Sequence, residues 1–356
     1  MERLCHERFL RQQQFGPGKG HGKTSVLSIA QLMVYCRAMK KLTAVIDKSM
    51  LQAICEQLPD KLDVCFNTLL GRYVLVVPSV LVEEVWVNLA SPSPGKPPEV
   101  VERMVACLLH LQDAWIAEPL EIAFVELVKR ESIDLLPRPK PAFLNSFHIL
   151  RRDNAALIEW VKKRSELHKV GIKQRIQEQT NILGSKKPAP VANCLEFFEE
   201  FIRPQFLEIL SDSDRKRKLL ESVLGLSFRA RHPDCSQEID KAFEDYSLDT
   251  FDNYHATFNC IMSAMFYFYA PLCETPLPGG SPRKLLGGGF SNQRSNLNDE
   301  KYVQSALLCA RLATCDEGMR NVMELFRACS LWNGQTIFVQ PDSGKELDAK
   351  LLGAVI

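Results

Sequence analysis

Residues 296–320 constrain the fold of this 356-residue chain more than any other segment, because they predict a helix, a short strand and a second helix in direct succession. Asn298 and Asp299 suit a helix start, and apolar residues then recur at spacings of three and four. Leu312–Thr314 predicts a strand, and Asp316 begins the next helix. A strand that passes directly into a helix is typical of α/β folds, which bind ligands at the carboxyl ends of their parallel strands.

Three further apolar runs predict strands that alternate with helices. Leu42–Ile46 is a short run that ends at Asp47, and Gln335–Val339 is the last such run. Tyr73–Val77 is apolar throughout, as expected for a strand that is buried on both faces of a parallel sheet, and Pro78 then begins a helix. The alternation predicts an α/β fold, more specifically a three-layer α/β/α sandwich with a mostly parallel sheet of four to five strands.

The remaining segments predict a divided domain. We expect an N-terminal lead-in and helix over 1–41 and the first half of the α/β domain over 42–98, which ends in a proline-rich boundary. Residues 99–295 show helical patterns and no clear strand, so they predict a mainly α-helical insertion. Residues 296–356 complete the α/β domain and add a C-terminal tail.

Composition excludes some classes of protein. A hydrophobic content of 46% is sufficient for a full core, and a formal charge of +1 gives no whole-molecule signal for nucleic acid. The twelve cysteines are scattered without a C-x-x-C pair, which favours buried thiols. Because no signal-peptide pattern opens the sequence, we expect a cytoplasmic protein. The apolar run 258–272 is shorter than the roughly 20 residues of a membrane span, so it predicts a buried helix and no membrane contact.

Two common ligand motifs fail on inspection. The segment Gly16–Thr24 resembles a phosphate loop, but Pro17 stands where that loop requires glycine, and no strand precedes it. None of the seven histidines forms a pair at zinc-ligand spacing.

Four acidic residues follow the predicted strands or start helices at the same sheet edge. They are Asp47, Glu84, Asp299 and Asp316. Glu83 is the alternative to Glu84, which we prefer because its apolar neighbours then face the sheet. A single aspartate at a helix start is commonly a cap, but four at matching ends favour a site. Clustered carboxylates raise one another's pKa unless a cation neutralises them, and hard oxygen ligands select Mg²⁺ or Mn²⁺.

These residues resemble the pattern of the PIN domain nucleases. The matching motifs are Val45-Ile-Asp47-Lys-Ser49, Val77-Pro-Ser-Val-Leu-Val-Glu-Glu84, Asn298-Asp299-Glu-Lys-Tyr302 and Leu312-Ala-Thr-Cys-Asp316. The resemblance covers about 42–90 and 296–340 and implies a metal-dependent endoribonuclease that cleaves RNA rather than DNA. The small toxin members of the family have no large helical insertion, so a simple toxin role is not implied.

The resemblance and the chemistry together assign roles. Asp47, Asp299 and Asp316 would bind the metal directly or through water, and Glu84 would bind the metal or orient a water molecule. Ser49 and Thr314 would donate hydrogen bonds that hold a carboxylate or a phosphate oxygen. We expect Asn298 to cap its helix.

The predicted insertion carries a basic stripe, which includes Arg151, Arg152, Lys162, Lys163 and Arg164. Between 151 and 187 there are ten basic residues and four acidic ones. Such a stripe could track phosphates, although the solvated face of a long helix gives the same pattern. The alternative function is a catalytically inactive PIN-like module that binds RNA or a protein partner. The helical part could also contact a second copy of the chain.

Overall fold

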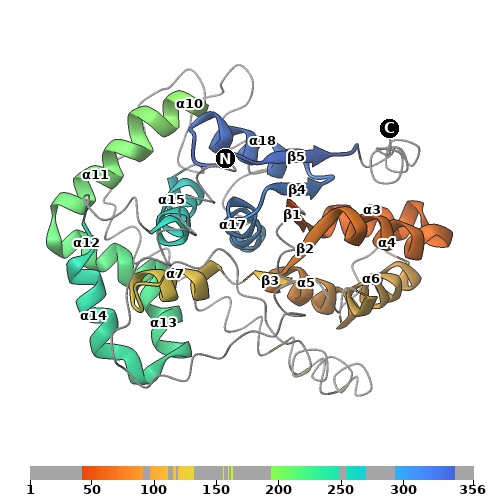
Figure 1. The fold of residues 1–356 in the computed structure, drawn as a ribbon, viewed down its shortest axis with the longest axis horizontal. Helices are drawn as coiled ribbons and strands as arrows, with labels where there is room; N and C mark the ends of the chain where they lie inside the picture. Colours follow the sequence, from red (N-terminus) through yellow and green to blue (C-terminus); the bar gives the residue numbers. More distant parts are fainter. Residues whose placement is uncertain are drawn as a thin grey trace, which may run out of the picture. The chain divides into compact units, whose positions relative to one another are not determined.

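The fold comes from a computed structural model of the chain (Figure 1), which describes residues 42–90, 97–110, 115–117, 119–131, 194–247, 254–269 and 293–340, together with positions 155, 159 and 162. All of these residues belong to one compact unit, Lys41–Ile356. Several predicted features lie outside the described residues: the lead-in and helix of 1–41 with its glycine-rich segment, most of the predicted insertion between 132 and 193, and the C-terminal tail.

A five-stranded parallel sheet is the centre of the fold (Figure 1). Its strands are β1 (Leu42–Ile46), β2 (Tyr73–Pro78), β3 (Trp115–Ala117), β4 (Arg311–Thr314) and β5 (Gln335–Phe338). They lie in the order β3-β2-β1-β4-β5, and every neighbouring pair is parallel. The four predicted strands and the α/β class are confirmed. The prediction that 99–295 hold no clear strand is wrong for Trp115–Ala117, which pairs with β2 at the sheet edge.

Strand β1 is the central strand, and its sequence explains why. Val45 pairs with Val76 of β2 on one side and with Leu312 of β4 on the other, and all three side chains are buried. A strand that pairs on both sides and is covered by helices has little contact with water. Its residues are therefore apolar, and β-branched residues pack well there.

The helices that follow β1 and β2 pack together. They are α3 (Lys48–Gln57), α4 (Leu62–Arg72), α5 (Ser79–Ala90) and α6 (Pro98–His110), with a short 3₁₀ turn at Pro59–Lys61. Helix α6 contacts α3, α4 and α5, while α4 and α5 contact β2. This packing buries Met50, Leu51 and Ile54 of α3.

A second group of helices packs around α17 (Gln293–Leu307), and one of them, α18 (Glu317–Ala328), also contacts β4 and β5. The group also contains α7 (Pro119–Leu127) and α15 (His255–Tyr269). Helix α17 contacts β1, β2, α5, α7, α15 and α18. The predicted start at Asn298 is wrong, since α17 begins at Gln293 and Asn298 therefore lies within the helix, where it cannot cap it.

The helical segment shares the core of the sheet domain. Its described elements are α10 (Cys194–Glu196), the π-helix Phe197–Ile202, α11 (Arg203–Ser211), α12 (Ser213–Leu220), the π-helix Glu221–Gly225, α13 (Leu226–Arg231), the 3₁₀ turn Pro233–Cys235 and α14 (Ser236–Asp245). The Phe198 and Phe266 rings each lie 5.8 Å from the ring of Phe326 on α18. Edge-to-face packing of three phenylalanines therefore joins this segment to the sheet domain.

Helix α15 corresponds to the apolar run that predicted a buried helix, and that prediction is confirmed. The helix has 15 residues and is buried along most of its length. The buried Glu126 carboxylate accepts hydrogen bonds from the backbone N–H groups of Ala256 and Thr257, at 2.8 and 3.2 Å, and so satisfies the start of this buried helix. None of the helices that the structure describes has both the length and the apolar character required to cross a membrane.

Candidate functional site

The sheet topology places two predicted aspartates side by side. Asp47 directly follows β1, and Asp316 follows β4, its parallel neighbour. From β1 the chain passes to β2 on one side, and it returns much later to β4 on the other. The carboxyl ends of β1 and β4 therefore form a topological switch point, where open α/β sheets place their ligand sites.

Asp47 is the N-cap of α3 and lies at the centre of a hydrogen-bond network. Its Oδ1 accepts from the backbone N–H of Met50 at 2.8 Å and from the Ser49 hydroxyl at 2.8 Å. Its Oδ2 accepts from the Thr314 hydroxyl at 2.5 Å. The main chain adds a bond from the Asp47 N–H to the carbonyl of Ala313, at 3.1 Å. Asp47 is thus held by its own helix and by β4.

The Ser49 and Thr314 hydroxyls have a fixed direction. The Cys315 N–H donates to Ser49 Oγ at 2.8 Å, and the Asp316 N–H donates to Thr314 Oγ1 at 2.9 Å. Because each hydroxyl accepts a backbone hydrogen bond from the turn after β4, its single proton is available to Asp47. The two hydroxyls therefore connect the turn that carries Asp316 to the Asp47 carboxylate.

The two aspartates differ in exposure. Asp47 is only 3% exposed, whereas Asp316 is exposed at the N-cap of α18, where its Oδ1 accepts from the Met319 N–H at 2.9 Å. Burial raises the pKa of Asp47 from 3.8 to about 6; its hydrogen bonds oppose the rise, and the negative charge of Asp316 adds to it. The site therefore holds a buried carboxylate whose ionisation is opposed by its burial and by the neighbouring Asp316.

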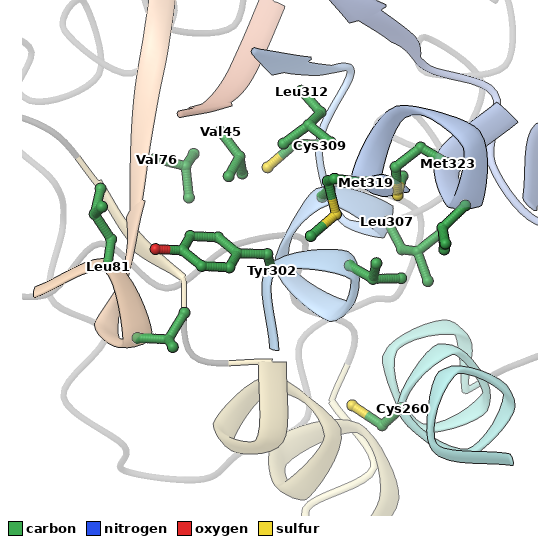
Figure 2. Close-up of a cluster of buried hydrophobic side chains, with 14 of the residues drawn as sticks. Val45, Val76, Leu81, Cys260, Tyr302, Leu307, Cys309, Leu312, Met319 and Met323 are labelled. Carbon is green, nitrogen blue, oxygen red and sulfur yellow. The ribbon is translucent and has the colours of Figure 1, made fainter. Parts of the chain in front are cut away.

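Glu84 is held by donors from two other elements. On α17, Asn298 Nδ2 donates to Oε1 at 3.0 Å and the Tyr302 hydroxyl donates to Oε2 at 2.9 Å. Figure 2 shows the Tyr302 side chain reaching from α17 toward Val76 and Leu81, so that its hydroxyl lies on the α5 side of the buried cluster. A lysine on α3, Lys48, adds an ion pair with Nζ 3.7 Å from Oε1.

Glu83, the alternative to Glu84, has a different environment. The Lys301 ammonium lies 4.0 Å from Glu83 Oε2. The direct hydrogen bonds from Asn298 and Tyr302 go to Glu84, and Glu84 contributes to the electrostatic environment of Tyr302 together with Asp47 and Asp299. The two glutamates therefore differ in their contacts, and the choice of Glu84 over Glu83 stays a prediction.

The pKa values of two buried tyrosines are raised by nearby carboxylates as well as by burial. The pKa of Tyr302 is raised well above its ordinary value by burial and by the charges of Glu84, Asp47 and Asp299. The pKa of Tyr267 on α15 is raised likewise by burial and by the charges of Asp299, Glu300 and Asp316, so Asp299 acts on both tyrosines.

The four acidic side chains do not form a compact ligand cluster. Within the described part of the chain, no group of three or more histidine, cysteine, aspartate or glutamate side chains is placed to hold a metal ion. Their chemistry nevertheless suits a hard divalent cation, since all four side chains are carboxylates.

Sequence patterns missed three contributors to this region. Lys48 and Tyr302 both contact Glu84, and the buried Glu300 accepts from the Gln304 amide at 2.9 Å. The apolar spacing of α17 indicated that Tyr302 faces the core. The one available signal was chemical, because a buried tyrosine hydroxyl usually has a hydrogen-bond partner.

The basic stripe lies almost entirely outside the described residues. Lys162 is described and exposed, while Arg151, Arg152, Lys163 and Arg164 fall outside. The stripe therefore remains a prediction.

Comparisons of the chain with models of known protein families, with curated proteins and with solved structures yield no match.

Proposed function

We propose that this chain is a PIN-like, metal-dependent nuclease whose α/β/α sandwich is interrupted by a helical insertion. Asp47, Glu84, Asp299 and Asp316 would form its acidic site. The reaction would be endonucleolytic cleavage of RNA phosphodiesters.

The observation that carries the proposal is the paired placement of Asp47 and Asp316 at the sheet's switch point. Thr314 donates to Asp47 and accepts from the Asp316 backbone, so one buried side chain fixes the relative position of both turns. Asp47 caps α3, but it is 3% exposed and its pKa is raised by burial, and perturbed carboxyl groups of this kind are more frequent at functional sites.

Mg²⁺ or Mn²⁺ fits the donors, and Asp47, Glu84, Asp299 and Asp316 would hold it. When bound, such a cation activates water and stabilises the leaving oxygen in phosphodiester hydrolysis. The chain's own residues would orient the carboxylates: Ser49 and Thr314 by donation to Asp47, and Asn298 and Tyr302 by donation to Glu84.

RNA as substrate follows from the resemblance to the PIN domain nucleases. The basic stripe at 151–187 supplies the positive charge that a phosphate backbone requires. Neutralising Lys162, Lys163 and Arg164 together should weaken RNA binding and reduce its dependence on salt, as measured by filter binding at several salt concentrations. An unchanged affinity and salt slope would remove the stripe from the proposal.

A second candidate function is a catalytically inactive PIN-like module that binds RNA or a protein partner. It is favoured by the environment of Glu84, whose two oxygens already contact Lys48, Asn298 and Tyr302. It is favoured too by the absence of a preformed ligand cluster among the described side chains. In this case the network around Asp47 would only stabilise the fold.

Cleavage of a panel of structured RNAs decides between the two functions. Wild type and Asp316→Asn would be assayed with Mg²⁺, with Mn²⁺ and with a chelator. Asp212→Asn is the matched control, because Asp212 is also an aspartate N-cap, at the start of α12, with hydrogen bonds to the Asp214 and Arg215 N–H groups. Metal-dependent cleavage lost only in Asp316→Asn supports the nuclease. Equal rates in all three proteins would exclude this site.

A further inference from the structure

Lys48 is the first residue of α3 and stands directly after Asp47. Its ammonium lies 3.7 Å from Glu84 Oε1, and the two side chains are 26% and 19% exposed, so the pair is only partly screened by water. The ion pair spans the gap between the helix that follows β1 and the helix that follows β2. It therefore places a positive charge against Glu84, one of the four acidic residues.

The hydrogen bonds of Glu84 make this ion pair replaceable. Tyr302 and Asn298 donate to Glu84 at 2.9 and 3.0 Å, which is closer than the ammonium of Lys48. These two donors would keep Glu84 in place if the lysine moved away. A flexible four-carbon stem lets the Lys48 ammonium leave without a change in the backbone.

A divalent cation at the same carboxylates would meet the lysine as a like charge. At separations of a few ångströms in a partly buried region, such repulsion is large compared with thermal energy. Lysine and divalent cation would therefore compete for Glu84.

We propose that Lys48 is a built-in counter-cation of Glu84, which the divalent cation must displace, so that Lys48 sets the cation concentration at which the site fills. The inference rests on the proposed function. It adds a residue that regulates the site without serving as one of its ligands.

The test measures cation affinity directly, with Mn²⁺ as the probe, by calorimetry and by the electron paramagnetic resonance of free Mn²⁺. Lys48→Met removes the charge and keeps the length of the side chain, whereas Lys48→Arg keeps the charge. Lys301→Met is the matched control, because Lys301 pairs with the neighbouring Glu83 at 4.0 Å and its loss changes the net charge equally. Circular dichroism would verify that each variant is folded.

We expect Lys48→Met to bind Mn²⁺ more tightly, on the order of tenfold, because a nearby like charge has been removed. Lys48→Arg and Lys301→Met should stay close to wild type. Unchanged or weaker Mn²⁺ binding in Lys48→Met would overturn the inference, as would an equal gain in Lys301→Met, which would reveal only a general charge effect.

Failure of the proposed function has a different signature. If Asp316→Asn bound Mn²⁺ as wild type does, or if none of the proteins bound it, the acidic site itself would be wrong and the role of Lys48 would fall with it. If wild type binds Mn²⁺, Asp316→Asn does not and Lys48→Met equals wild type, only the present inference fails.

Discussion

Thr314 and Asp47 are 267 positions apart in the chain, yet the Thr314 hydroxyl donates to the Asp47 carboxylate at 2.5 Å. Both residues are buried, and each stands at the carboxyl end of one of two neighbouring parallel strands. A charge-assisted hydrogen bond is short and strong, and it loses its value when either partner is removed. The bond is therefore a sensitive point for both stability and the candidate site.

Thr314→Val should destabilise the fold and weaken the site. The substitution keeps the shape but removes a donor to a buried carboxylate, which costs about 1.5–3 kcal/mol. Urea unfolding measures the first effect and Mn²⁺ titration the second. Thr257→Val is the control: the Thr257 hydroxyl is buried as well, but it donates to the backbone carbonyl of Ala123 at a longer distance, 3.4 Å. Equal losses of Mn²⁺ affinity in both variants would contradict a role for Thr314 in the site.

The contribution of Asp47 to the stability of the cation-free protein should fall as the pH rises from about 4 to 6. Burial raises the pKa of Asp47 from 3.8 to about 6, so in this window the folded state holds a proton that the unfolded state has released. The contribution of Asp47 is therefore complete below the window and is lost through it, by about 3 kcal/mol for a shift of this size. Above pH 6 the contribution of Asp47 is constant.

Asp47→Asn isolates this contribution, because the amide does not titrate. Urea unfolding in the presence of a chelator should show that the stability of Asp47→Asn relative to wild type increases between pH 4 and 6. Asp212→Asn, at the exposed N-cap of α12, serves as the control. Parallel stability curves for wild type and Asp47→Asn would show that the buried carboxyl does not titrate in this range.

Tyr302→Phe should loosen Glu84 while leaving the core packed. The phenol donates to Glu84 at 2.9 Å, and loss of a group that orients a ligand commonly lowers metal affinity or activity by about 10- to 100-fold. Tyr246→Phe is the control, because the buried Tyr246 hydroxyl has no hydrogen-bond partner in the described structure. We expect Tyr246→Phe to be neutral or slightly stabilising. A Tyr302→Phe protein with normal Mn²⁺ affinity would show that Glu84 is held well enough by Asn298 or is not a ligand.

The sequence predicted the parts of the sheet that depend on local hydrophobic pattern. Strands β1, β2, β4 and β5 are apolar runs bounded by polar or turn residues, and each lies at the predicted position. Strand β3 was missed because three residues are too few to show a period, and because its conformation depends on pairing with β2 at the sheet edge. The start of α17 was missed because Asn298 and Asp299 imitate an N-cap.

The candidate site was likewise predictable only in part from the sequence. Asp47 and Asp316 could be predicted to lie together, because strand ends in a parallel sheet share one edge. The contacts of Glu84 with Lys48 and Tyr302 could not, because they depend on how α3, α5 and α17 pack against one another. Sequence periodicity predicts which face of a helix is apolar, but it does not predict which polar side chains form hydrogen bonds or ion pairs with one another.

Glu84→Gln and Glu83→Gln together decide which glutamate the site uses. If Glu84 is a ligand, Glu84→Gln should lower the rate of metal-dependent cleavage on the order of 100-fold. Loss of a group that only supports a ligand lowers affinity or activity by about 10- to 100-fold, and loss of the ligand should cost at least as much. Glu83→Gln removes the same charge one residue away, at a side chain that pairs with Lys301 at 4.0 Å, so its rate should stay within a few-fold of wild type. The two rates would be measured on one RNA substrate at saturating Mn²⁺ and again at limiting Mn²⁺. A larger loss in Glu83→Gln would reverse the assignment, and the contacts of Glu84 with Asn298 and Tyr302 would then be structural.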